Sequence, residues 1–148
     1  MTRIVVTGAA GFIGSHLAEY LLNQGHQIFG IDNFDDFYSR FIKKQNISAC
    51  LLNPSFTFIE GNVGDVASIF PDTNFDVIIH LAAKAGVRPS IAQPEQYIDA
   101  NLSQTMALLQ WMKTHGMNKL VFASSSSVYG NNVKVPFAES DPVDHPIS

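Results

Sequence analysis

A short apolar run that breaks into three evenly spaced glycines constrains the fold of this chain more than any other feature. Residues 4–14 read IVVTGAAGFIG, with glycine at positions 8, 11 and 14. Gly8 allows a tight turn at the end of a strand, and Gly14 lets the following helix pack closely against the sheet. Gly11 lets the backbone approach a pyrophosphate, toward which the helix N-terminus directs its free N–H groups. The segment therefore predicts a strand, a turn and a helix that bind a dinucleotide.

An acidic residue at the end of the second predicted strand indicates which dinucleotide is bound. This strand covers Gln27–Asp32, and its last residue is an aspartate. The carboxylate of Asp32 can accept hydrogen bonds from the adenosine ribose hydroxyls, and it would repel a 2′-phosphate. The cofactor is therefore expected to be NAD rather than NADP. The alternative interpretation is that Asp32 only caps an exposed strand end.

The rest of the chain alternates between predicted strands and predicted helices. The strands are Arg3–Thr7, Gln27–Asp32, Phe56–Glu60, Phe75–Leu81 and Lys119–Ser124, and the helices are Phe12–Asn23 and Pro94–His115. An irregular, partly helical stretch is expected at residues 33–54. This alternation predicts an α/β fold with a Rossmann-type, doubly wound parallel sheet. With 148 residues and 46% hydrophobic content, the chain fits one such domain, residues 1–148, and no second one.

Apolar spacing predicts which helix faces point into the core. In the first helix these residues are Ile13, Leu17 and Leu21, and in the second they are Ile98, Leu102, Met106, Leu109 and Met112. The aromatic residues of the irregular stretch are expected to pack in the core rather than line a nucleotide site: Phe34, Phe37, Tyr38 and Phe41.

Composition excludes several classes of partner. The formal net charge is −4 and no basic cluster is present, so neither nucleic acid nor an anionic membrane is an expected partner. No apolar run approaches membrane-spanning length, and a cytoplasmic location is the expectation. Cys50, the single cysteine, is expected to be a buried thiol. The five histidines are scattered along the chain, with no paired cysteine or carboxylate at the spacing of metal ligands, so no metal site is predicted.

Small and polar residues follow three of the predicted strands. The third strand runs into residues 61–65, GNVGD, the fourth into residues 80–86, HLAAKAG, and the fifth into residues 124–127, SSSS. Ligands of open parallel sheets bind beyond the carboxyl ends of the strands, so these segments are expected to line one crevice. His80 is interpreted as a hydrogen-bonded structural residue.

Several of these segments together resemble the extended short-chain dehydrogenase/reductase family. They are TGAAGFIG at residues 7–14, Asp32-Asn33, HLAA at residues 80–83, Asn101, and SSSSVYG at residues 124–130. Within this family, GVRPS at residues 86–90 and the tail 136–148 resemble nucleotide-sugar epimerases, most closely UDP-glucuronate 4-epimerases. The resemblance spans nearly the whole chain.

The resemblance implies a reaction, a cofactor and an assembly. NAD takes a hydride from C4 of a UDP-sugar and returns it to the opposite face, which converts UDP-glucuronate to UDP-galacturonate. The helix at Pro94–His115 would contribute to a homodimer interface, so part of its apolar surface is expected to be exposed. Asn62 is expected to accept a hydrogen bond from the adenine amino group. The glycine pattern and the resemblance together assign these cofactor contacts: Gly8, Gly11, Phe12, Ile13, Gly14, Asp32, Asn33, Asn62, Val63, Leu81, Ala82, Ala83, Ala85 and Asn101.

The resemblance also assigns residues that act on the sugar. Ser125 is the first candidate for the hydrogen bond to the C4 hydroxyl, because it lies four residues before Tyr129, and Ser126 is the second. Tyr129 itself is expected to pack rather than catalyse. Arg88, with Ser90 nearby, is expected to contact the substrate through a phosphate or the hexuronate carboxylate, and the alternative is a solvated loop charge. Lys84 has the same two interpretations.

One departure from the family pattern bears on activity. The family's catalytic Tyr-x-x-x-Lys pair is absent from residues 1–148, and the family would place it just beyond Ser148. The chain is therefore expected to be the amino-terminal part of an epimerase and to be inactive by itself. Alternatives are a UDP-glucose 4-epimerase, a dehydratase, a uronate decarboxylase, or a non-catalytic NAD-binding module. Dehydratases carry an Asp-Glu pair where this chain has Ser126 and Ser127, which argues against elimination chemistry.

Overall fold

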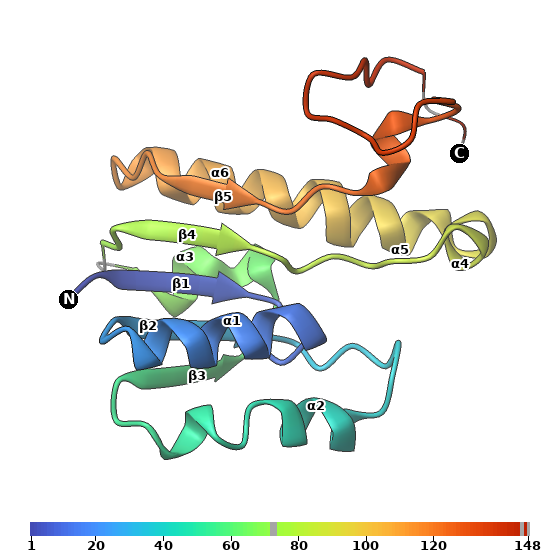
Figure 1. Cartoon of the computed structure of the whole chain (residues 1–148). Coiled ribbons are helices and arrows are strands. Elements are labelled where there is room, and N and C mark those ends of the chain that lie inside the picture. Colours follow the sequence, from blue (N-terminus) through green and yellow to red (C-terminus); the bar gives the residue numbers. More distant parts are fainter. Residues whose placement is uncertain (72–73, 146, 148) are drawn as a thin grey trace.

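Five parallel strands form one sheet at the centre of the molecule (Figure 1). The computed structural model describes residues 1–71, 74–145 and 147; Pro146 and Ser148, part of the tail that carries the family resemblance, lie outside this part. The strand order is β3-β2-β1-β4-β5, which is the Rossmann-type arrangement that the sequence predicts. The strands are β1 Arg3–Thr7, β2 Gln27–Asp32, β3 Phe56–Glu60, β4 Val77–His80 and β5 Leu120–Phe122.

The first three strands have the predicted bounds, whereas β4 and β5 are shorter than predicted. At the end of β4, the Leu81 N–H donates both to the Thr7 carbonyl oxygen, at 3.3 Å, and to the Thr7 side-chain oxygen, at 3.1 Å, as the chain leaves the sheet. The edge strand β5 has only β4 as a neighbour, and it pairs with it over Leu120–Phe122. An edge strand is limited by the length of its one partner, which explains why the prediction Lys119–Ser124 was too long.

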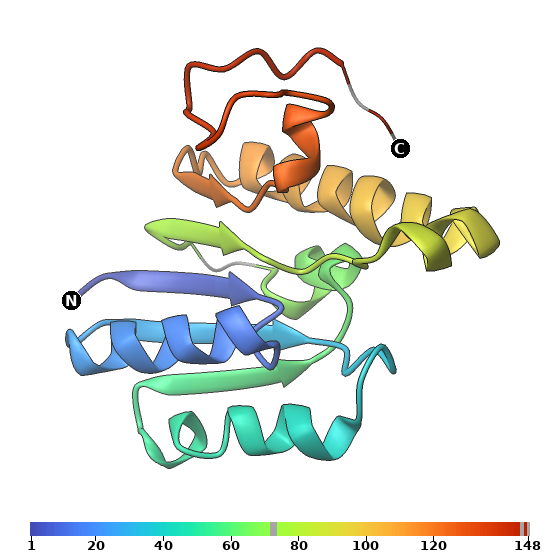
Figure 2. The same cartoon turned by 45° about the vertical axis from the view of Figure 1, so that its right-hand side comes forward.

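The helices are α1 Phe12–Asn23, α2 Arg40–Asn46, α3 Val66–Ile69, α4 Val87–Ala92, α5 Pro94–Ile98 and α6 Gln104–Thr114. Helix α1 packs on one face of the sheet, and α3 and α6 pack on the other. The helix predicted over Pro94–His115 is divided, because a turn of π-helix at Asp99–Ser103 separates α5 from α6. The view in Figure 2 shows that the loops after β2 and β4 extend beyond the same edge of the sheet as the N-terminus of α1.

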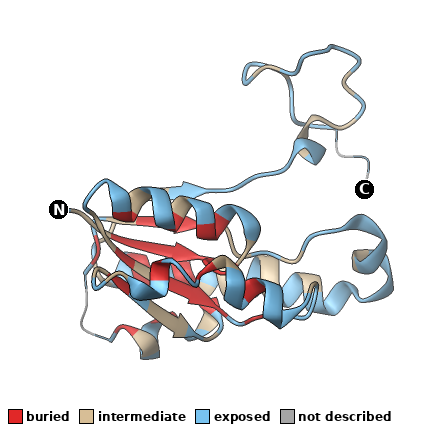
Figure 3. Ribbon diagram, turned by 60° about the horizontal axis from the view of Figure 1, so that its bottom comes forward, coloured by how far each residue is buried: buried red, intermediate tan, exposed pale blue. Residues whose placement is uncertain are grey.

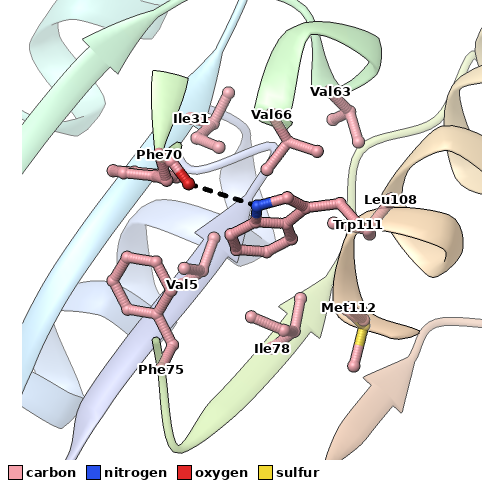
Figure 4. Close-up of a cluster of buried hydrophobic side chains, with 10 residues drawn as sticks. All are labelled: Val5, Ile31, Val63, Val66, Phe70, Phe75, Ile78, Leu108, Trp111 and Met112. Carbon is pink, nitrogen blue, oxygen red and sulfur yellow. Dashed lines mark hydrogen bonds between the residues drawn. The ribbon is translucent and has the colours of Figure 1, made fainter. Parts of the chain in front are cut away.

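The two faces of the sheet have separate cores. Alternate residues of β1 serve both: Ile4 and Val6 pack with α1, and Val5 packs with α3 and α6. Figure 4 shows the second core around Trp111, whose Nε1 donates a hydrogen bond to the Phe70 carbonyl oxygen at 3.2 Å. Burial of the large ring together with its polar N–H fixes α6 against α3.

The predicted inward face of α1 was partly wrong. Ile13 is exposed, and Leu17 and Leu21 are only half-buried. The face against the sheet consists of Gly14, Ser15, Ala18 and Leu22. Small residues occupy this face because the helix begins almost in contact with the glycine turn, where larger side chains have no room.

The predicted core face of the second helix was also wrong, except at Met112. The exposed residues are Ile98, Leu102, Met106 and Leu109, whereas the buried ones are Leu108, Trp111 and Met112. The helix carries two apolar stripes at helical spacing, and periodicity alone does not distinguish them. Figure 3 shows that the segment from α4 to α5 and the chain beyond β5 are largely exposed or half-buried. In the described residues, no helix is long and apolar enough to cross a bilayer.

Candidate functional site

A groove of about 740 Å³ lies at the carboxyl ends of the strands. It is bordered by the loops after β1, β2, β3 and β4 and by the π turn between α5 and α6. Its position is the one at which open parallel sheets bind ligands, and its volume is typical of small-molecule sites. The residues predicted as cofactor contacts that line the groove are Gly8, Gly11, Phe12, Ile13, Gly14, Asp32, Asn33, Asn62, Val63, Leu81, Ala82, Ala83 and Ala85.

The three glycines at the head of the groove form a turn that excludes side chains. Gly8 has φ of +68°, in the left-handed region that favours glycine, and a Cβ there would lie 2.9 Å from the Ala82 nitrogen. A Cβ on Gly14 would lie 2.1 Å from the Gly8 carbonyl oxygen, which no real contact permits. The tight turn predicted for Gly8 and the close packing predicted for Gly14 are therefore confirmed.

The N-terminus of α1 faces the groove, and no polar side chain caps its free backbone N–H groups. Its N-cap is Gly11, which supplies no side-chain hydrogen bond, and no acidic residue lies in the first turn. The first N–H groups of a helix need acceptors, and the helix dipole adds partial positive charge there. This end of the groove therefore favours an anionic group.

Asp32 is buried at the side of the groove rather than exposed at a strand end. Its Oδ2 accepts a hydrogen bond from the Ala10 N–H at 3.1 Å, and its Oδ1 accepts one from the Phe34 N–H at 2.8 Å. The ammonium of Lys43, also buried, lies 3.4 Å from Oδ1. These contacts exclude the alternative interpretation of Asp32 as an exposed cap, and they fix its carboxylate in place.

Two groove residues lie close to Asp32: Lys43, which the sequence analysis missed, and Tyr38, which it assigned to the core. Lys43 and Tyr38 both line the groove, and the Lys43 ammonium lies 5.3 Å from the centre of the Tyr38 ring. The Tyr38 hydroxyl is buried, and the Phe12 backbone and the Asn46 side chain lie near it. Burial, together with the negative charge of Asp32, raises the pKa of Tyr38, so its hydroxyl is a hydrogen-bond donor. No periodic pattern in residues 33–54 marks either side chain.

The aromatic residues of this stretch therefore behave differently from one another. Phe34 is buried, as predicted, and its ring packs against that of Phe58. Phe37 and Tyr38 line the groove, and Phe41 is exposed, so the prediction that they pack in the core was wrong. Phe37 and Tyr38 are not packed in the core because the loop between β2 and α2 lies at the groove, where no strand of the sheet covers it.

Asn62 and Asn33 interact directly at the end of the groove beside β3. The Nδ2 of Asn33 donates a hydrogen bond to the Oδ1 of Asn62 at 3.0 Å. The Asn62 oxygen, predicted to accept from adenine, thus already has one donor. A carbonyl oxygen has a second lone pair, so it keeps the capacity to accept another hydrogen bond.

Thr7 and His80 join the end of β1 to the end of β4 beneath the groove. The Thr7 hydroxyl accepts hydrogen bonds from the Leu81 and Ala82 N–H groups, each at 3.1 Å, and lies 2.7 Å from His80 Nδ1. His80 Nε2 lies 3.0 Å from the Thr105 hydroxyl, which itself donates to the Asn101 carbonyl. Burial lowers the pKa of His80. The predicted structural role of His80 is confirmed.

Asn101 holds the loop after β4 rather than lining the groove. Its Oδ1 accepts a hydrogen bond from the Lys84 N–H at 2.8 Å, and its Nδ2 donates to the Lys84 carbonyl oxygen at 3.0 Å. Asn101 lies within the π turn, a feature that often occurs at functional sites. The structure therefore places Asn101 behind the groove wall, as a residue that positions the loop.

The residues predicted to act on a sugar lie outside this groove. Ser125 and Ser126 are exposed in the loop after β5, and Ser125 Oγ accepts a hydrogen bond from the Ser127 N–H at 3.2 Å. Tyr129 stacks on Phe137 with ring centres 4.6 Å apart, so its predicted packing role is confirmed. Arg88 and Ser90 lie in α4, and the Ser90 hydroxyl bonds to the Val87 carbonyl oxygen at 2.6 Å.

Two further sequence expectations concern Cys50 and metals. Cys50 is buried, as predicted, and burial raises the pKa of its thiol. Across the part of the chain that the structure describes, no group of three or more His, Cys, Asp or Glu side chains is arranged to hold a metal ion.

The parallel sheet, the glycine turn and the groove define a Rossmann-type dinucleotide-binding domain. Residues 5–148 match the family model described as GDP-mannose 4,6 dehydratase. The chain belongs to this family of extended short-chain dehydrogenases/reductases that act on nucleotide sugars.

Similar proteins support this assignment. Protein CapI of Staphylococcus aureus is 43% identical over 99% of this chain and 44% of its own length. UDP-glucuronate 4-epimerase 4 of Arabidopsis thaliana is 40% identical over 98% of this chain and 34% of its own length. The crystal structure of UDP-glucuronic acid 4-epimerase from Bacillus cereus, in complex with UDP-glucuronic acid and NAD, has a TM-score of 0.85, at 38% identity, and covers 98% of this chain and 46% of that one. The chain thus spans less than half the length of these relatives.

Proposed function

We propose that the groove binds NAD and that the chain is the cofactor-binding part of a nucleotide-sugar epimerase. The observation that carries this proposal is the uncapped N-terminus of α1, which follows the glycine turn and lies in the same groove as buried Asp32. The Bacillus cereus relative of known structure was solved with NAD. The residues present fit the cofactor, because the groove offers N–H donors for a pyrophosphate and a carboxylate for ribose hydroxyls.

Each part of the groove has a role in this proposal. The N–H groups at the start of α1 hold the pyrophosphate, and Asp32 accepts hydrogen bonds from the adenosine ribose. The second lone pair of the Asn62 amide oxygen accepts from the adenine amino group. The buried Tyr38 hydroxyl supplies one more donor beside Gly11. The small residues after β4 leave room for the remaining half of the cofactor: Leu81, Ala82, Ala83 and Ala85.

The proposed parent reaction is the conversion of UDP-glucuronate to UDP-galacturonate. Bound NAD would supply the acceptor for the C4 hydride. Ser125, or Ser126 as the second candidate, hydrogen-bonds the C4 hydroxyl, and Arg88 pairs with the uronate carboxylate or a phosphate, with Ser90 beside it. Arg88, Ser125 and Ser126 are exposed and Ser90 is half-buried, which is consistent with contacts to a substrate outside the groove. A UDP-glucose 4-epimerase is the second candidate, since only the Arg88 argument separates the two sugars.

A homodimer and a cytoplasmic location belong to the same proposal. The exposed apolar stripe of Ile98, Leu102, Met106 and Leu109 supports a helical interface between two copies. Sedimentation of the Met106→Glu variant tests the dimer, which should dissociate while the stability of the monomer is unchanged. Fractionation of cells that produce a tagged chain tests the location.

Cofactor binding can be measured through the only tryptophan. Trp111 is the single tryptophan of the chain, so its emission reports on one site. We expect NADH to quench this emission by energy transfer with saturation at one cofactor per chain, and an excess of NAD to reverse the quenching. NADPH should quench only at much higher concentration. Quenching that does not saturate would contradict a specific site.

Turnover tests the proposed reaction. Residues 1–148 contain no Tyr-x-x-x-Lys pair, and general-base catalysis is worth about a hundredfold to ten-thousandfold. The chain alone, given NAD and UDP-glucuronate, should therefore form no UDP-galacturonate above background. A chimera that appends the carboxyl-terminal half of the Bacillus cereus relative should convert UDP-glucuronate, and its Ser125→Ala variant should have a lower kcat with little change in KM. Turnover by the 148-residue chain, or preference of the chimera for UDP-glucose, would contradict the proposal.

A further inference from the structure

An ion pair joins the loop after β2 to the loop after β4 across the groove. The Lys84 Nζ lies 2.7 Å from the Asp35 Oδ2, and the two side chains are only 23% and 25% exposed. In the sheet, β1 lies between β2 and β4, so this contact passes over the end of β1, where the glycine turn begins. Both residues line the groove.

Each partner is held in place by its own loop. The Asp35 Oδ1 accepts a hydrogen bond from the Phe37 N–H at 3.1 Å, which leaves Oδ2 for Lys84. The backbone of Lys84 is fixed at both its N–H and its carbonyl by Asn101. The carboxylate of Asp35 and the backbone of Lys84 are therefore pre-positioned for the ion pair, whereas the side chain of Lys84 is ordered only when the pair forms.

The two loops also approach each other at a second point. A Cβ on Gly86 would lie 3.9 Å from the Phe37 ring, so only a narrow space separates these two residues. The bond to Asp35 raises the pKa of Lys84. Burial by itself raises the pKa of Asp35, but the hydrogen bond from Lys84 lowers it overall. Both partners are thus charged near neutral pH.

The other charged residues of the groove affect where the Lys84 ammonium lies. Among the described residues that line the groove, the cations are Lys43 and Lys84, and Lys43 lies against Asp32. Glu95 and Asp99 add negative charge to the wall formed by α5 and the π turn. The negative charge of Asp36, next to Asp35 in the chain, also attracts Lys84 and favours its pairing with this loop.

We propose that Asp35 and Lys84 form a strap across the cofactor groove, so that a dinucleotide enters or leaves only when this ion pair separates. The proposal rests on the NAD-binding function proposed above. The strap stays closed over the bound cofactor, and it acts on the rates of binding and release more than on affinity. Asn101 is a positioning residue for the strap.

The test measures rates of NADH association and dissociation by stopped flow, through Trp111 emission. In Lys84→Met and in Asp35→Asn, both rates should rise on the order of fivefold, as expected for the loss of a partly exposed ion pair, and Kd should change by less than about threefold. Because either substitution breaks the same contact, the double variant should match the single ones.

A matched control comes from a second ion pair on the same side of the sheet. Arg40 Nη2 lies 2.6 Å from the Glu60 Oε2, and neither residue lines the groove. Arg40→Met should leave both rates unchanged. If Lys84→Met weakens NADH binding while Asp35→Asn strengthens it, Lys84 contacts the pyrophosphate instead and the strap is overturned.

Hydrogen exchange of the cofactor-free chain separates this proposal from the proposed function. Lys84→Met should increase amide exchange in both loops, residues 33–39 and residues 81–86, because the strap couples them. Increased exchange in residues 81–86 alone would overturn the strap, whatever NAD does. Coupled exchange in a chain that binds no NADH would instead overturn the proposed function and leave the contact between the loops established.

Discussion

Two regions at the same edge of the sheet differ in how completely the described residues build them. Around the glycine turn, Gly14 and Asp32 are buried, and Asp32 has two N–H donors and a lysine as partners. Around the loop after β5, Ser125 and Ser126 are exposed, and so are Val121 and Phe122 in the strand itself. The first region has its geometry fixed by contacts within this chain, whereas the second has few such contacts.

This difference in packing suits the first region to ligand binding but leaves the second region without the order that catalysis requires. A site whose groups are already packed and hydrogen-bonded loses little entropy when a ligand binds, because little remains to be ordered. Catalysis by contrast requires reacting groups to be held within a narrow geometry, which exposed serines without packing partners do not provide. We therefore expect the cofactor region to function within these residues and the serine loop to depend on additional contacts.

The largest effect should appear when the buried and exposed stripes of the second helix are compared. Leu108 is 0% exposed and Leu102 is 61% exposed, although both lie on the same helical segment. Leu108→Ala should lower the free energy of unfolding by about 2 to 5 kcal/mol, because it leaves a cavity beside Trp111. Leu102→Ala should cost less than about 1 kcal/mol by chemical denaturation. Equal losses would contradict the assignment of the core face.

A smaller effect is expected in cofactor preference, where the opposite charges of Asp32 and Lys43 should act in opposite directions. Asp32→Ser removes the carboxylate and leaves the buried Lys43 ammonium, which would attract a 2′-phosphate. The ratio of NADP to NAD affinity should rise about tenfold to a hundredfold, the range expected for hydrogen bonds to charged groups. Adding Lys43→Met should remove this gain. A ratio that is the same in both variants would exclude a role for Lys43.

The pH dependence of stability should report the buried histidine beneath the groove. Burial lowers the pKa of His80, so as pH falls below the unfolded value of about 6.5 the unfolded chain binds the proton first. The free energy of unfolding should therefore decrease with falling pH, by at most about 1.4 kcal/mol per pH unit, until the pH reaches the folded pKa. His80→Gln should flatten this slope between pH 7 and pH 5 in denaturation experiments. An unchanged slope would show that groups other than His80 cause the pH dependence of stability.

The smallest effect is expected in the serine loop. Ser125→Ala removes an exposed side chain whose one described hydrogen bond is to the Ser127 N–H. The free energy of unfolding should change by less than about 0.5 kcal/mol, and NAD affinity should not change. A marked loss of NAD binding in this variant would show that the two regions are not independent.

The same contrast explains what the sequence predicts well. The first three strands and α1 have the predicted bounds, because local signals mark their ends. Glycine follows β1 and β3 directly, β2 ends at an aspartate, and α1 lies between Gly11 and Gly25. The placement of Asn62 and Leu81 beside the glycine turn follows from the parallel order of the strands. These features need only local pattern and sheet topology.

Other features depend on loop conformation, which no period in the sequence encodes. Lys43 faces Asp32 because the chain between them folds back over the sheet, and Lys84 reaches Asp35 only because Asn101 holds its backbone. The core face of α6 was missed for a different reason, since the helix carries two apolar stripes and the π turn changes the phase between its halves.

Calorimetric titration of the purified chain with NAD tests the central claim most directly. We predict one NAD per chain, NADP binding at least about tenfold weaker, and a loss of at least about tenfold in NAD affinity in Gly14→Ala, whose Cβ would lie 2.1 Å from the Gly8 oxygen. Gly61→Ala is the matched control, because Gly61 also lines the groove but its Cβ would meet nothing closer than 3.4 Å. A folded wild-type chain that shows no heat of NAD binding, or that binds NADP equally well, would contradict the account.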